Sequence, residues 1–233
     1  MENYLEINFE KNMKMLSEAI KCSEDNYSHN DIIEVLKSDD DIKKQFCLIE
    51  LNKIDSQEEA NILVFNLTNH SGPIRETSAF KIGELISNDK YKKYFQTEEI
   101  INTFVKAIVD INPSVSRYSV EFIKFVDDVE YLYKKIIEEI EITLANIDET
   151  VKNRSYVQNK KNFNLYWNLE AIIAISNKIE PNDKLLKILK RTALSNDYTI
   201  REKTAKTANL LNIQPVLSLL KDDENVYVRK YLK

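Results

Sequence analysis

A polar residue followed three positions later by a branched apolar residue recurs along the chain. Asp, Ser and Asn fill the polar position, and they are favoured helix N-caps because their side-chain oxygens accept bonds from first-turn amides. After three of these caps, apolar or small residues follow at spacings of four, four and three, which place them on one helical face. The pattern predicts helices beginning at Asp39, Ser71, Asn112, Asp197 and Asn225, with buried anchors at Ile42, Ile74, Val115, Ile200 and Val228.

Each predicted helix follows another amphipathic segment that can be its hairpin partner. These segments are 29–38, 56–68, 97–110, 129–147, 182–195 and 213–221. A weaker copy of the pattern begins at Asn162 and runs through Leu165, Leu169 and Ile173, where Phe163, Tyr166 and Trp167 blur the stripe. The anchors lie at distances typical of helical-hairpin arrays.

We therefore predict an all-α fold, a right-handed α-solenoid of about five to six helical hairpins. It forms one domain over 1–233, with a capping helix within 1–26, repeats over 28–233 and a longer connector at 151–161. Solenoids need such terminal caps to cover the last apolar face. An irregular helical bundle with coincidental caps is the alternative.

Two strings resemble the second helix of HEAT repeats, including the subclass similar to phycobilisome lyases. They are GPIRETSAFKIGEL and LLKDDENVYVRKYL. Arg75, Arg201 and Arg229 occupy the characteristic Arg position, and Gly83 occupies the Gly position. Lys43, Ser116 and Tyr166 depart from the pattern, which puts a continuous Arg–Asp ladder in doubt. These arginines have two interpretations: bonds to the carbonyls or acids of neighbouring turns, or ligand binding.

Composition excludes several functional classes. The chain has only two glycines and four prolines, and it lacks the Gly-rich loops that hold phosphates. The formal net charge of −5 disfavours a dedicated nucleic-acid binder, which needs clustered Lys and Arg. Cys22 and Cys47 form no metal-binding motif, the N-terminus does not resemble a signal peptide, and the apolar runs are too short to span a membrane. We expect a cytoplasmic protein.

Candidate chemistry is sparse. The only histidines, His29 and His70, have no metal-ligand spacing, and no carboxylate pair stands out as a general acid and base. We therefore expect no cofactor, no metal and no catalytic residue.

Binding is the function that this architecture favours. The resemblance to HEAT repeats implies that second helices line a concave surface, where Phe80, Tyr118 and Trp167 are candidate partner-binding residues; the alternative is that they belong to the core. The basic connector at 151–161 and the segment KYKKYF at 90–95 are further candidates, against the alternatives of a linker and an inter-repeat turn.

The sequence thus predicts a non-catalytic scaffold whose groove binds a peptide or protein partner. Another reading comes from resemblance to helical-repeat DNA glycosylases, with Trp167 beside a damaged base and Glu170 supporting hydrolysis. A chromophore-lyase or chaperone-like role is suggested only by the repeat subclass.

Overall fold

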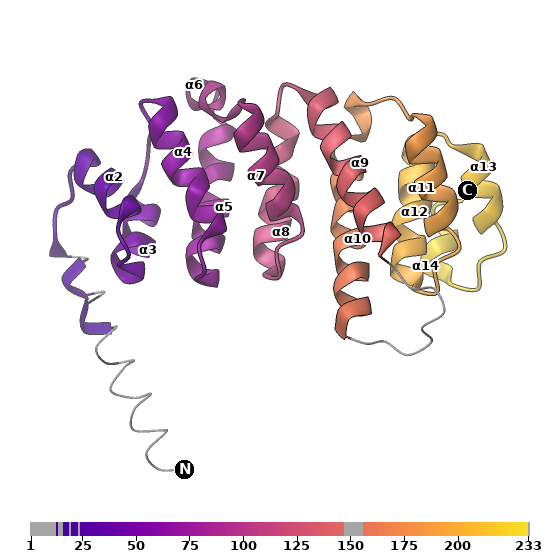
Figure 1. Ribbon diagram of the computed structural model, residues 1–233, viewed down its shortest axis with the longest axis horizontal. Helices are drawn as coiled ribbons and strands as arrows, with labels where there is room; N and C mark the ends of the chain where they lie inside the picture. The colour runs from indigo at the N-terminus through magenta and orange to yellow at the C-terminus, as the bar shows by residue number, and fades with distance from the viewer. Residues whose placement is uncertain (1–12, 14–15, 19, 23, 147–155, 233) are drawn as a thin grey trace, which may run out of the picture. The chain divides into compact units, whose positions relative to one another are not determined.

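The computed structural model describes residues 13, 16–18, 20–22, 24–146 and 156–232, and every regular element in these ranges is a helix (Figure 1). The predicted all-α class is confirmed. Contacts divide the chain into two compact units, Met1–Phe95 and Gln96–Lys233, which are described in turn. Of the predicted capping helix, residues 1–12 lie outside the described residues, and Met13, Leu16 and Ile20 are each about half exposed.

The first unit consists of two hairpins and a short connector. Its helices are α2 (His29–Lys37), α3 (Asp41–Glu50), α4 (Gln57–Phe65), α5 (Gly72–Ile86) and α6 (Asp89–Lys92), with 3₁₀ turns η1 (Asn66–Thr68) and η2 (Lys93–Phe95). The first helices of the two hairpins, α2 and α4, pack together, and so do the second helices, α3 and α5. The hairpins therefore stack as two layers.

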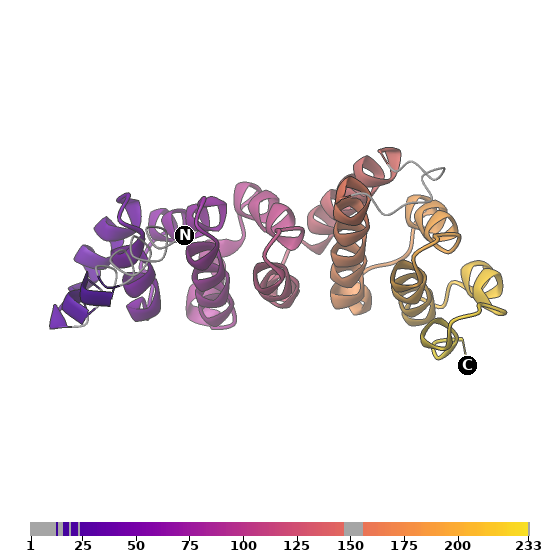
Figure 2. The same cartoon turned by 90° about the horizontal axis from the view of Figure 1, so that it is seen from below.

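The second unit repeats this arrangement. It contains α7 (Glu98–Ile108), α8 (Pro113–Phe122), η3 (Ile123–Phe125), α9 (Val129–Ala145), α10 (Tyr156–Ile175), η4 (Ser176–Lys178), α11 (Asp183–Thr192), α12 (Tyr198–Leu210), α13 (Gln214–Leu220) and α14 (Val226–Arg229). One layer holds α7, α9, α11 and α13, and the other holds α8, α10, α12 and α14, as packing between neighbours shows (Figure 2).

The apolar residues predicted to anchor the repeats are buried, except Ile42 in the first repeat. Ile74, Val115, Ile200 and Val228 are fully buried, and Leu165 is nearly so. Small polar residues in mid-helix are also buried where neighbouring helices approach, namely Ser78, Ser119 and Thr204.

The first repeat departs from the prediction. Asp40, not Asp39, caps α3, because its carboxylate accepts the Lys43 amide while its own amide bonds to the hydroxyl of Ser38. This one-residue shift leaves Ile42 half-buried and gives the core positions of α3 to Cys47 and Leu48.

The connector prediction at 151–161 is also corrected. Residues 147–155 lie outside the described residues, but α10 begins at Tyr156, so 156–161 is helical and Asn162 is not a cap. The segment contains no Pro or Gly that would end a helix, and its Lys and Gln residues are good helix formers.

The turns before the second helices share one hydrogen-bond pattern. A polar side chain two positions before the cap accepts the cap's own amide; the pairs are Ser38–Asp40, Asn69–Ser71, Asp110–Asn112, Ser195–Asp197 and Asp223–Asn225. Four positions after the cap, a side chain donates to the carbonyl of that same polar residue; these donors are Arg75, Ser116, Arg201 and Arg229. Arg75, Arg201 and Arg229 thus hold their turns onto the helices that follow, and Ser116 does the same before α8.

Candidate functional site: an aromatic hollow between α10 and α12

Three aromatic side chains lie on the face of α10 that points away from the core. Phe163, Tyr166 and Trp167 are spaced three and four residues apart, so they lie on one helical face, and each is half-buried. Leu165 and Leu169 point into the core instead. A helix that buries one face against its neighbours therefore presents three aromatic rings on the other.

The three rings hold one another in place. The ring centroids of Tyr166 and Trp167 are 5.3 Å apart at an interplanar angle of 84°, and those of Phe163 and Trp167 are 6.1 Å apart at 68°. Edge-to-face contacts of this kind are favourable because the positive ring edge meets the negative ring face. The cluster is therefore ordered before any partner arrives.

A buried ion pair supports the cluster from α12. The ammonium group of Lys203, whose residue is only 8% exposed, pairs with the Glu170 carboxylate and lies 4.7 Å from the centroid of the Tyr166 ring. Burial acts to lower the pKa of Lys203, but the bond and the charge of Glu170 outweigh it, so the pKa is raised. Lys203 remains charged and fixes Tyr166 by a cation–π contact.

The rings open onto a hollow of about 320 Å³. Its lining comes from α10 and from the start of α12, and consists of Asn159, Asn162, Phe163, Tyr166, Trp167, Asp197 and Thr199. Asp197 is held there because it caps α12, accepting the Thr199 amide at 3.0 Å, and because Asn162 Nδ2 donates to its carboxylate at 3.2 Å. We call this site the α10 hollow. It combines an aromatic wall with one carboxylate.

The structure separates the three predicted binding residues. Trp167 lines the α10 hollow, whereas the half-buried Tyr118 lies on α8 outside it. Phe80 lies on α5 in the other unit, 45% exposed. Phe163 and Tyr166 do line the hollow, although from the sequence they only blurred the core stripe. The signal that could have identified them is the spacing from Phe163, because Tyr166 follows it by three residues and Trp167 by four.

The other predicted features have structural explanations. Glu170, the catalytic residue of the glycosylase reading, has its carboxylate bound to Lys203, whereas a general base needs a carboxylate within reach of its substrate's proton. In the segment 90–95, Tyr91 and Phe95 are buried, and the Tyr94 hydroxyl donates to the carbonyl of Asp55 at 3.1 Å. That segment is therefore an inter-repeat turn with its aromatic rings packed inward.

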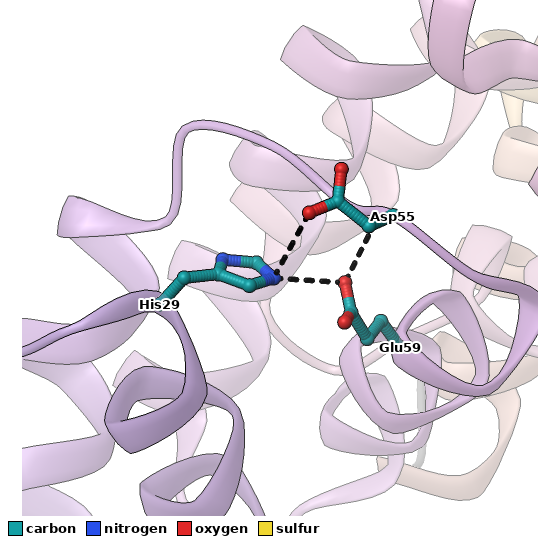
Figure 3. Close-up of side chains that lie close together, drawn as sticks. All are labelled: His29, Asp55 and Glu59. Carbon is teal, nitrogen blue, oxygen red and sulfur yellow. Dashed lines mark hydrogen bonds and ion pairs between the residues drawn. The ribbon is translucent and has the colours of Figure 1, made fainter.

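A second cluster lies in the first unit, where His29, Asp55 and Glu59 meet (Figure 3). Each offers one metal-ligating atom, and these atoms all lie within 4.8 Å of one another. No metal-ligand spacing along the chain indicated this group, because its members come from two different hairpins. The side chain of the other histidine, His70, is 85% exposed, and its Nε2 lies 3.5 Å from Asp41 Oδ2.

Within the part of the chain that the structure describes, none of the helices has both the length and the apolar character needed to cross a bilayer.

Known proteins resemble this chain in its fold and provide no information about the α10 hollow. No protein-family model matches the chain, and no curated protein matches it. Among solved structures, the chain is similar to an engineered protein, with a TM-score of 0.52 and 12% identity over 89% of this chain and 96% of that one. It is also similar to a designed armadillo repeat protein in complex with the peptide (KR)4, with a TM-score of 0.50 and 15% identity over 86% and 95%.

These similarities confirm the predicted helical-repeat solenoid, of armadillo-like type. At such identities they bear on the fold alone, so membership of the HEAT family stays a prediction.

Proposed function

We propose that this chain is a non-catalytic binding protein whose α10 hollow takes up a basic peptide segment of a partner protein. The observation that carries the proposal is the ordered set of three aromatic rings beside a carboxylate. Preformed aromatic side chains anchor interfaces because they bury a large area without losing much conformational freedom on binding.

The chemistry of the hollow favours a cationic side chain. Aromatic ring faces attract ammonium and guanidinium groups, and Asp197 supplies a negative charge at the same hollow. The net charge of −5 adds a general attraction for basic partners. The volume of about 320 Å³ lies at the lower end of the range for ligand pockets, roughly 300–1,000 Å³, which suits one or two side chains better than a large cofactor.

A solved structure of the same fold supports the choice of peptide. The designed armadillo repeat protein is in complex with (KR)4, a peptide of alternating Lys and Arg. Stacked helical hairpins present an extended surface, so a peptide can continue from the hollow along neighbouring second helices.

Trp167 makes the proposal directly testable, because it is the only tryptophan in the chain. We expect its fluorescence to change on titration with (KR)4 and to stay unchanged with an acidic peptide of the same length. By calorimetry, Trp167→Ala should weaken binding of (KR)4 by at least about tenfold, the loss typical of an anchoring aromatic. The matched control is Phe80→Ala, which removes an exposed aromatic from the other unit and should leave binding unchanged.

Selection from a randomised peptide library tests function and chemistry separately. The wild-type chain should enrich peptides rich in Lys and Arg, and the Trp167→Ala chain should not. Enrichment of acidic or purely apolar peptides contradicts the proposed partner chemistry. Equal enrichment by both chains contradicts the α10 hollow as the binding site, provided that circular dichroism shows the variant to be as helical as the wild type.

A further inference from the structure

The cluster of His29, Asp55 and Glu59 joins two successive hairpins of the first unit. His29 is the first residue of α2, Glu59 lies in the first turn of α4, and Asp55 lies in the loop just before the α4 cap, Ser56. Because α2 packs against α4, side chains about thirty residues apart converge on one point (Figure 3).

The geometry suits a metal ion with little rearrangement. His29 Nε2 lies 3.0 Å from Glu59 Oε2 and 3.8 Å from Asp55 Oδ2. Zinc binds imidazole nitrogen and carboxylate oxygen at about 2.0–2.2 Å, so tetrahedral ligand atoms stand about 3.2–3.6 Å apart. These two separations bracket that range, and the oxygens of Asp55 and Glu59 lie within 4.8 Å of each other.

The ligands are held in position and remain accessible. Glu59 Oε2 also accepts the backbone amide of Asp55 at 2.7 Å, which fixes the Glu59 carboxylate relative to the Asp55 backbone. Such outer bonds orient metal ligands. The side chains of His29 and Asp55 are 22% and 47% exposed, and a hollow of about 440 Å³ adjoins His29. An ion can therefore enter, and water can complete its coordination.

One group competes with a metal for the same oxygen. The ammonium of Lys53 lies 2.5 Å from Asp55 Oδ2. Lys53 is on the surface and its side chain is 46% exposed, so it can swing into solvent at little cost.

We propose that His29, Asp55 and Glu59 bind a divalent transition-metal ion of the zinc class, which bridges α2 to α4. The imidazole selects such an ion over magnesium and calcium, which prefer all-oxygen sites. Three protein ligands with the remaining position open to solvent is an arrangement that zinc accepts. The site lies in the first unit and is independent of the peptide function proposed for the α10 hollow.

The two cysteines are further potential zinc ligands, and they do not offer an equivalent site. Cys22 and Cys47 are both buried, and burial raises the pKa of the Cys47 thiol to about 11. A thiol binds zinc as the thiolate, which is scarce at neutral pH under these conditions.

The test is calorimetric titration of the untagged full-length chain, stripped with chelator, with ZnCl₂. Co²⁺ serves as a second probe, because its visible absorption reports nitrogen and oxygen ligands. We expect binding of one ion per chain. His29→Gln and Glu59→Gln should each weaken it by about 10–100-fold or more, the range found when a group supporting a metal site is removed. Lys53→Met should strengthen it, since the competing ammonium is gone.

Two matched controls complete the experiment. His70→Gln removes the histidine outside the cluster and should leave zinc binding unchanged. The double variant Cys22→Ser, Cys47→Ser should do the same. The proposal is overturned if the wild-type chain shows no binding at millimolar zinc, or if binding survives His29→Gln and Glu59→Gln but is lost with the cysteines or His70. Circular dichroism confirms that each variant is folded.

Discussion

Successive hairpins are joined by different chemistry in the first and the last repeats. Between α12 and the turn before α14, the Arg201 guanidinium binds both oxygens of Asp223, at 2.6 and 3.1 Å, and the two side chains are 11% and 6% exposed. Between α2 and α4, the imidazole of His29 bonds to Glu59 at 3.0 Å, nearer to solvent. The contact between the last two hairpins is therefore a bidentate pair of a guanidinium and a carboxylate.

Successive hairpins can thus be linked by an ion pair or by an imidazole and carboxylates, and the two kinds of link respond differently to their surroundings. The buried guanidinium–carboxylate pair fixes its two partners, and the Asp223 carboxylate is further occupied by the Asn225 amide, which donates to it at 2.8 Å. An imidazole with two carboxylates keeps lone pairs that a proton or a metal ion can use. We therefore expect the last repeats to be held rigidly by charge, and the first repeats to respond to their ionic surroundings.

The largest effect is expected when one partner is removed from each of the two contacts, Arg201–Asp223 and His29–Glu59. Arg201→Met leaves the Asp223 carboxylate buried without its counter-charge, so we expect a destabilisation of about 3–5 kcal/mol. Glu59→Gln, measured without metal, should cost only about 1 kcal/mol, the usual net contribution of one hydrogen bond. Hydrogen exchange read separately in α12–α14 and in α2–α4 measures both. Equal losses of stability in the two variants would contradict the difference that we infer between the two contacts.

Acid should weaken the Arg201–Asp223 ion pair, and only over the pH range in which Asp223 becomes protonated. The bond from Arg201 lowers the pKa of Asp223 against the opposing effect of burial, and the Asn225 amide adds to the lowering. Because the pKa is lower in the folded chain, this stabilisation is present above the unfolded value of about 3.9 and is lost as the pH falls through the folded value.

Urea unfolding of wild type and Asp223→Asn between pH 6 and pH 2 isolates this contribution from that of the other carboxylates. At pH 6 the variant should be less stable by about 1.5–3 kcal/mol, the worth of hydrogen bonds to a charged group. The gap should close toward pH 2. A gap that is constant with pH would mean that Asp223 contributes through packing rather than through its charge.

The helix starts were predictable because capping is local. The residues that bond in the turn before α12 are Ser195, Asp197 and Arg201, all within seven positions, so a single sequence contains the whole motif. The same holds for the buried anchors Val115, Ile200 and Val228, whose burial follows from helical spacing. The α3 cap was missed by one residue because three consecutive aspartates, 39–41, all satisfy the cap preference. The structure distinguishes Asp40 by the bond that its amide donates to the Ser38 hydroxyl and the bond that its carboxylate accepts from the Lys43 amide.

The sites were less predictable because packing between helices creates them. His29 and Glu59 are thirty residues apart and have no metal-ligand spacing; only the stacking of α2 on α4 brings them together. Lys203 reaches Glu170 and Tyr166 from a different hairpin in the same way. Trp167 could be named as a candidate because it falls beside the core stripe of its helix, whereas the hollow next to it depends on where α12 begins.

The helix caps give a smaller contrast between a helix of the first unit, α5, and one of the second unit, α14. Asn225 accepts the amide of Tyr227, two positions later, at 2.8 Å. The residue two positions after Ser71 is Pro73, which has no amide hydrogen, and the Ser71 side chain makes no capping bond. We therefore expect Asn225→Ala to destabilise α14 by about 1 kcal/mol and Ser71→Ala to cost only a few tenths of that for α5.

Exchange rates of the first-turn amides in α14 and α5 measure the two costs directly, since opening of a helix end exposes those amides first. A large loss at Ser71 would mean that its hydroxyl stabilises the turn by a route other than capping. In that case the hydrogen bond that the Ser71 amide donates to Asn69 Oδ1 would not by itself account for the stability of this turn, because any residue except proline at position 71 can donate it.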